Sequence, residues 1–315
     1  MDEPHPIPCT SVSVMDALAD DDFQLALYCC YELHYRGFAG VDDRWEWEPS
    51  LLAWRQELER GMERSLLRRL GPIPDEVGDV ETAIRAAIDA HDGPSLSAYV
   101  RDEGTLDQVR ELAVHRSAYQ RKEADPHTWG IPRLADGPKA ALVEIQLDEY
   151  GGGVESEMHA TLFATTMHEL GLDPGYGAYL DLLPGPTLAT TNLISMFGLH
   201  RRWLGALVGH LAVFETTSVE PMSRYGAALR RLGVASAAER FYDVHVVADA
   251  HHEIVACKAL AGGLAAAEPD LAPDIVFGAR ALLLVEGRFA EHVLEAWAGG
   301  RSSLRAPLPA AAAAP

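Results

Sequence analysis

The chain contains 315 residues, and its 26 lysines and arginines stand against 47 aspartates and glutamates, which gives a formal charge of −21 with histidine neutral. This acidic balance argues against a nucleic-acid partner, because such proteins bind phosphate through basic stripes that this sequence lacks. Hydrophobic residues make up 48% of the chain, as in a globular protein with a large core, and no uncharged apolar run reaches the roughly eighteen residues that a membrane span requires.

Residues 1–15 are acidic, contain prolines, lack the pattern of a signal peptide and are expected to form a flexible leader. Apolar residues then recur at three- and four-residue spacings, which predicts an all-α protein. Residues 16–305 contain no linker, charge block or repeat and are expected to form a single helical domain. The predicted helices span residues 21–35, 49–70, 79–90, 95–101, 105–125, 138–170 with an interruption, 187–200, 203–218, 221–232, 235–264 and 274–297. Residues 306–315, rich in alanine and proline, are expected to form a disordered tail.

Proline, glycine and a capping threonine define several of these helix ends. The second helix opens on Pro49 and stops at Gly71. The long helix that Thr105 caps is expected to break at Pro126.

The cysteines indicate a cellular compartment. Four occur, two of them adjacent and none in a CxxC pair: Cys9, Cys29, Cys30 and Cys257. So few thiols in a chain of this length are typical of reduced, buried residues, and we expect a cytoplasmic protein.

The most informative segment for function lies between residues 241 and 253. His245, Asp249 and His252 stand at positions i, i+4 and i+7, which places all three on one face of a helix within two turns. Two imidazoles and a carboxylate on one stripe can hold one metal ion or bridge two. A solvated polar face or hydrogen-bonded core histidines explain the pattern equally well when it is taken alone.

Further candidate ligands surround an unusual run of glycines. Residues 151–153 are three glycines inside a helical stretch, and each costs roughly 1 kcal/mol relative to alanine. Such a run indicates a kink or a close approach of the backbone to another element or a ligand. Glu149 and His159 flank the interruption and could both turn inward, and Glu123 lies upstream near the end of its predicted helix. Any one of these glutamates would by itself be read as a surface carboxylate.

Taken together, these residues resemble the haem-oxygenase-like diiron oxidases and oxygenases, also called the iron-containing redox enzymes. That family has a glutamate on a first core helix, a glutamate followed ten residues later by a histidine on a second, and His-x3-Asp-x2-His on a third. This sequence fills all six positions in order: Glu123, Glu149, His159, His245, Asp249 and His252. The segments 34–38, 122–129 and 144–151 are also similar to the family, and the resemblance runs from about residue 30 to 300. It implies a haem-oxygenase-like helical bundle with a dimetal site between three core helices.

The ligand types that the resemblance implies decide which metal would bind. Three carboxylates and three imidazoles without a thiolate suit iron(II), two ions per chain, with manganese as the alternative, better than a structural zinc site. The resemblance then implies an O2-dependent nonhaem diiron enzyme acting on a small metabolite in biosynthesis, by N-oxygenation of an amine or amino acid or by oxidative C–C cleavage. No dinucleotide-binding motif is present, so electrons are expected to come from an external donor or from the substrate. No nucleic-acid or membrane partner is expected, and a homodimer is one possible assembly.

Three further residues are candidates for contacts behind the ligands or for the substrate pocket: Ser156, Glu215 and His251. Some N-oxygenating members of the family carry an additional glutamate three residues before the second-helix histidine, and Ser156 occupies that position here. Glu215 follows an apolar run and is otherwise a helix-end carboxylate, while His251 faces away from His245 on a helix. The alternative functions are a haem-binding oxygenase, which needs only one axial histidine, and a helical protein that binds metal or small molecules without catalysis.

Overall fold

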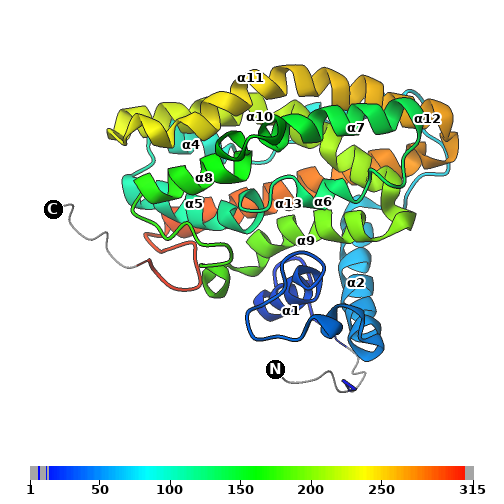
Figure 1. Ribbon diagram of the computed structural model, residues 1–315, viewed down its shortest axis with the longest axis horizontal. Helices are drawn as coiled ribbons and strands as arrows, with labels where there is room; N and C mark the ends of the chain where they lie inside the picture. The colour runs from blue at the N-terminus through cyan, green and yellow to red at the C-terminus, as the bar shows by residue number, and fades with distance from the viewer. Residues whose placement is uncertain (1–5, 8–11, 13, 309–315) are drawn as a thin grey trace.

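The computed structural model describes residues 6, 7, 12 and 14–308. Most of the leader expected over residues 1–15, and most of the tail expected over 306–315, lie outside the described residues. Within the described part every regular element is a helix, which confirms the all-α prediction (Figure 1). No helix in that part is both long enough and apolar enough to cross a bilayer.

The helices agree with the predicted ones in most of their bounds. They are α1 (Asp21–Glu32), α2 (Pro49–Leu70), α3 (Val80–Asp89), α4 (Leu96–Asp102), α5 (Leu106–Gln120), α6 (Asp125–Thr128), α7 (Asp136–Glu149), α8 (His159–Glu169), α9 (Gly185–Leu199), α10 (Leu204–Leu232), α11 (Arg240–Ile254), α12 (Gly263–Ala267) and α13 (Ala272–Ala298). Short 3-10 turns join several of them, and a π-helical segment over Val255–Gly262 connects α11 to α12.

The centre of the bundle is the long helix α10, which packs against α13 on one side and α11 on another. Figure 1 shows α11 and α7 along one long face, α9 along the opposite one, and α1 beyond α9. Helix α8 contacts both α5 and α11. Residues from the end of α5, the end of α7, the middle of α10 and the middle of α11 line one small void.

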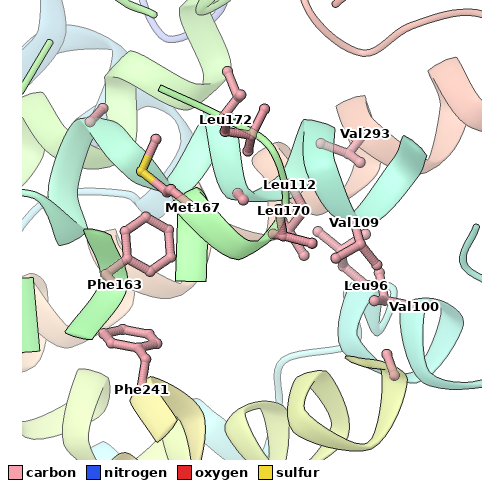
Figure 2. Packing of buried hydrophobic residues seen from close by; sticks show 14 of the residues in the cluster. Leu96, Val100, Val109, Leu112, Phe163, Met167, Leu170, Leu172, Phe241 and Val293 are labelled. Carbon is pink, nitrogen blue, oxygen red and sulfur yellow. The ribbon is translucent and has the colours of Figure 1, made fainter. Parts of the chain in front are cut away.

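An apolar cluster fixes α8 and α11 relative to each other (Figure 2). Phe163 lies one turn after His159 on α8, and Phe241 lies one turn before His245 on α11. Their rings meet edge to face, with centroids 5.0 Å apart, and both are fully buried. This contact turns His159 and His245 toward each other at the next turn of each helix.

Two glycines allow α10 and α13 to touch backbone to backbone. A Cβ atom added to Gly209 would lie 1.8 Å from the carbonyl oxygen of Ile275, and one added to Gly278 would lie 2.0 Å from that of Ala206. No side chain fits at such distances, so the spacing of the two longest helices depends on these glycines.

Gly209→Ala is expected to lower the free energy of unfolding by about 2–3 kcal/mol, because the methyl group must push α13 away from α10. Gly263→Ala is the matched control: its Cβ would meet only the Pro138 side chain at an ordinary 3.5 Å, and alanine is the better helix former by up to about 1 kcal/mol. Urea unfolding of the metal-free proteins measures both changes. Equal midpoints for Gly209→Ala and the wild type would show that the helices are not in contact there.

The structure also corrects some expected helix bounds. Helix α10 continues through Pro221 instead of stopping at Ser218, and α5 ends at Gln120, so Glu123 follows a helix end. Pro126 lies in the first turn of the short α6, where its missing N–H costs no helical hydrogen bond. The segment expected to be one helix over 235–264 is divided into a 3-10 turn, α11, the π-helical segment and α12.

The glycine run separates α7 from α8. Gly151, Gly152 and Gly153 all have positive φ angles, of 63°, 61° and 84°, which L side chains rarely adopt. A Cβ on Gly151 would lie 2.5 Å from the backbone of Glu157. The kink and the close approach that the sequence indicated are therefore both present, and they place the last residue of α7 next to the first residue of α8.

Candidate metal centre

Five segments of the chain direct carboxylates and imidazoles into one buried pocket. Glu123 comes from the turn after α5, Glu149 ends α7, and His159 begins α8. Helix α10 contributes Glu215 from its middle, and α11 contributes the remaining three from one face: His245, Asp249 and His252. All seven side chains are buried.

The seven residues form two overlapping groups that could each hold a metal ion. The first group contains Glu123, Glu149, His159 and His245, and the second contains Glu149, Glu215, Asp249 and His252. Within each group one potential ligand atom from every residue lies within 4.8 Å of the others. Glu149 belongs to both groups.

The two oxygens of Glu149 point toward different histidines. Oε2 lies 2.8 Å from Nδ1 of His159, and Oε1 lies 3.7 Å from Nδ1 of His252. The carboxylate is therefore placed between the two groups, as a bridging ligand would be.

The other side chains of each group are also close to one another. In the first group, Nε2 of His245 is 3.7 Å from Oε1 of Glu123, and the rings of His159 and His245 are 4.2 Å apart. In the second, Nδ1 of His252 is 3.3 Å from Oε2 of Glu215 and 3.7 Å from Oδ1 of Asp249.

Hydrogen bonds behind two of the histidines decide which nitrogen faces the pocket. Nδ1–H of His245 donates to the carbonyl oxygen of Phe241 at 2.7 Å, which leaves Nε2 toward Glu123. Nε2–H of His252 donates to Oδ2 of Asp148 at 3.1 Å, which leaves Nδ1 toward the carboxylates. Metal-binding histidines are oriented by contacts of this kind. The hydroxyl of Ser218 similarly donates to Oδ2 of Asp249 at 2.5 Å.

Several polar atoms of the pocket are buried without a hydrogen-bond partner. They are Oε2 of Glu123, Nδ1 of His159, Nε2 of His245 and Oδ1 of Asp249. Nδ1 of His159 is near Oε2 of Glu149, but the two atoms are not aligned as a hydrogen bond. Native proteins pair nearly all buried polar atoms, so four such atoms at one place require an explanation. Each of them is a lone-pair donor in its deprotonated form. A cation in the first group would satisfy the atoms of Glu123, His159 and His245, and a cation in the second group would satisfy that of Asp249. The residues present therefore fit a metal ion.

The pKa values of the pocket residues also show that the pocket favours bound positive charge. Burial, together with the charges of neighbouring carboxylates, raises the pKa of Glu149 to about 7 and that of Glu215 to about 8. Burial acts to lower the pKa of His245 and His252, but the surrounding carboxylates outweigh it and raise the two values to about 10 and about 11. The metal-free pocket thus retains protons, which metal ions must displace.

The structure brings the six residues of the sequence pattern into this pocket and adds Glu215. The sequence predicts Glu215 as a residue behind the ligands or in the substrate pocket, with a helix-end carboxylate as the alternative, because the helix was expected to end at Ser218. Since α10 runs on to Leu232, Glu215 lies in mid-helix and faces inward. The apolar run before it, which is buried over residues 211–213, was the available signal.

Two other candidates do not reach the pocket. Ser156 is exposed on a 3-10 turn, where its hydroxyl donates to Glu157 at 3.5 Å. The side chain of His251 is 60% exposed and is bonded to Glu144 at 2.9 Å on the outer face of α7. The 3-10 turn carries Ser156 outward, and the 100° step per residue of α11 turns His251 away from its neighbour His252.

Comparison with known proteins identifies the family. The sequence matches the family described as iron-containing redox enzymes over residues 110–287, more than half of the chain, and all seven pocket residues lie in that range. It is also similar to nitrosourea synthase of Streptomyces achromogenes subsp. streptozoticus, with 27% identity over 186 residues. The similar region covers 58% of this chain and 40% of that protein, so the chain spans less than half the length of this curated relative. From the family match and the helical bundle we conclude that the chain belongs to the iron-containing redox enzymes and has their haem-oxygenase-like fold.

Proposed function

We propose that this protein is an O2-dependent nonhaem diiron oxygenase. One iron(II) would be held by Glu123, Glu149, His159 and His245, and the other by Glu149, Glu215, Asp249 and His252. The observation that carries the proposal is the placement of Glu149, whose two oxygens face the two groups separately. A single-metal site or a haem pocket would give no reason for two complete groups around one shared carboxylate.

The charges and ligand types support iron(II) as the metal. Four carboxylates, when ionised, balance the four positive charges of two divalent ions. Nitrogen and oxygen ligands without a thiolate suit iron(II), with manganese as the alternative. When bound, two ferrous ions supply the electrons and the Lewis acidity with which O2 is reduced. Glu215 provides from α10 the additional carboxylate that Ser156 cannot provide.

We further propose that the oxidised atom of the substrate is nitrogen. Nitrosourea, the product named for the similar protein, contains nitrogen bonded to oxygen. The balanced reaction for a primary amine is R–NH2 + O2 + 2 e⁻ + 2 H⁺ → R–NHOH + H2O. The O–O bond breaks, one oxygen enters an N–H bond, the other leaves as water, and an external donor supplies the two electrons.

The protein's own groups would prepare this chemistry in three ways. Burial of all seven side chains excludes bulk water from the reacting atoms. The Phe241 carbonyl and the Asp148 carboxylate hold the imidazoles of His245 and His252 in fixed tautomers. Ser218 fixes one oxygen of Asp249 and leaves Oδ1 free toward the pocket.

Oxygen uptake tests the proposal directly. The protein is loaded anaerobically with iron(II) and mixed with oxygenated buffer, and O2 consumption is recorded with an electrode. We expect one O2 to be consumed per two iron(II) in the absence of a reductant, and repeated turnover when a reductant and an oxidisable amine are added. Uptake no faster than that of the same iron(II) without protein would contradict an oxygenase and favour a protein that binds metal without catalysis.

Asp148→Ala is expected to weaken iron(II) binding about 10–100-fold, because His252 loses the partner that orients it. Glu144→Ala is a closely matched control. Both residues lie on α7 one turn apart, their side chains are 53% and 54% exposed, and Glu144 contacts the outward-facing His251. Anaerobic titration monitored by a competing chelator gives both affinities. Equal affinities for the two variants would show that the Asp148 contact does not support the site.

A further inference from the structure

A cavity of about 270 Å³ lies between α5, α10 and α13, directly beside the metal pocket. Its volume equals that of about nine water molecules. Tyr119 and Phe214, whose rings meet edge to face with centroids 5.4 Å apart, line both this cavity and a small void at the ligands. Ser218 also lines the cavity, and its hydroxyl binds Asp249. The inner end of the cavity therefore borders the metal centre.

One ion pair stands out among the mainly apolar walls. Arg116 of α5 and Glu286 of α13 form a bidentate pair, with nitrogen–oxygen distances of 2.9 and 2.8 Å. The guanidinium also lies over the Phe289 ring, 4.5 Å from its centroid. The two charged side chains line the cavity and keep 24% and 27% of their surface accessible. His91, an exposed residue at the outer end, is the one other ionisable group with a basic nitrogen along the described walls.

The pair has unused hydrogen-bonding capacity of both signs. A guanidinium has five N–H donors and a carboxylate has about four acceptor sites, and a bidentate pair uses two of each. The Tyr225 hydroxyl takes one further donor of Arg116, which leaves two donors for a ligand. A ligand with only a carboxylate would be attracted by Arg116 and repelled by Glu286, and a ligand with only an ammonium group would experience the reverse. A zwitterion can place its carboxylate at the first and its ammonium at the second without opening the pair.

We propose that this cavity binds a free α-amino acid, whose carboxylate and ammonium groups are held by Arg116 and Glu286. Its side chain extends inward past Tyr119 and Phe214 to the metal centre. The oxidation of the bound side chain rests on the proposed function, whereas the binding of the amino acid does not. Arg116 and Tyr119 are one turn of α5 apart, or about 4.5 Å along the helix, so a linear side chain of about four or more atoms is needed to pass both.

Three small molecules that differ by one group each provide the test: L-norleucine, hexanoate, which lacks the amine, and pentylamine, which lacks the carboxylate. Calorimetric titration of the full chain, once metal-free and once anaerobic with iron(II), is expected to show norleucine bound at least tenfold more tightly than either of the others. Hexanoate or pentylamine binding as tightly as norleucine, or no binding of norleucine to either form, would overturn the proposal.

The Glu286→Gln variant distinguishes a loss of ligand recognition from a loss of folding, because the two ligands should respond in opposite directions. It should weaken norleucine binding at least about tenfold and strengthen hexanoate binding, because the repelling charge is gone. Glu63→Gln, which removes a similar pair with Arg202 on the surface, should change neither. A Glu286→Gln protein that loses both ligands alike would contradict the assigned role. If the proposed diiron centre is wrong, anaerobic titration will show no binding of two iron(II) ions, but norleucine will still bind to the metal-free chain.

Discussion

Glu149→Gln is expected to abolish the binding of both iron(II) ions. Each group loses a potential ligand, and the two ions would lose the one carboxylate that belongs to both groups. Anaerobic titration should fall from about two ions per chain to fewer than about 0.2. No other single residue of the pocket belongs to both groups, so no other single replacement should have this effect.

The same replacement should stabilise the metal-free protein, which distinguishes loss of a ligand from loss of the fold. Burial and neighbouring carboxylates raise the pKa of Glu149 to about 7. A raised pKa means that the ionised group destabilises the folded state, and this cost grows as the pH rises through the folded value. At pH 8 glutamine removes that cost, and we expect a gain of roughly 1–3 kcal/mol. Thermal unfolding with and without iron(II) measures both effects. A destabilised metal-free variant, or one that still binds two ions, would contradict the assignment.

Glu215→Gln is expected to leave one iron(II) per chain and to reduce O2 uptake at least about 100-fold. Glu215 belongs to the second group alone, so the first group keeps its full set of ligands. One ferrous ion can supply one electron, whereas the reaction requires two at once. Titration and oxygen-electrode measurements on the same preparation give the stoichiometry and the rate.

Glu123→Gln is the matched counterpart, because Glu123 belongs to the first group alone. It should also retain one ion, and uptake should be equally low. The double variant Glu123→Gln/Glu215→Gln should bind neither. If the Glu215→Gln protein still binds two ions per chain, Glu215 is not itself a metal ligand.

The part of the centre on α11 could be predicted from the sequence because helix periodicity alone brings its residues together. His245, Asp249 and His252 recur at the spacing of one helix face, and all three are buried on the same side of α11. The glycines between Glu149 and His159 indicated a kink or a close approach that could turn both residues inward, and the family resemblance identified the two as ligands. Local chain geometry determines both features, so a linear pattern contains them.

Contacts between distant helices could not be predicted in the same way. Glu215 was left open because a proline six residues later indicated a helix end, yet packing against α11 and α13 keeps α10 helical through Pro221. The Asp148 contact with His252 depends on how α7 lies against α11, which no local signal encodes. The pairing of Arg116 with Glu286 joins residues 170 positions apart and appears only when α5 and α13 are assembled.

Anomalous diffraction at the iron edge tests the central claim most directly. Crystals of the full chain are grown anaerobically with iron(II), and the two groups predict two strong peaks in the buried pocket, one on each side of the Glu149 carboxylate. The peak between Glu123, His159 and His245 and the peak between Glu215, Asp249 and His252 should have comparable heights. A single peak, or no peak within the pocket while the protein is folded and iron is in excess, would contradict a diiron centre in this protein.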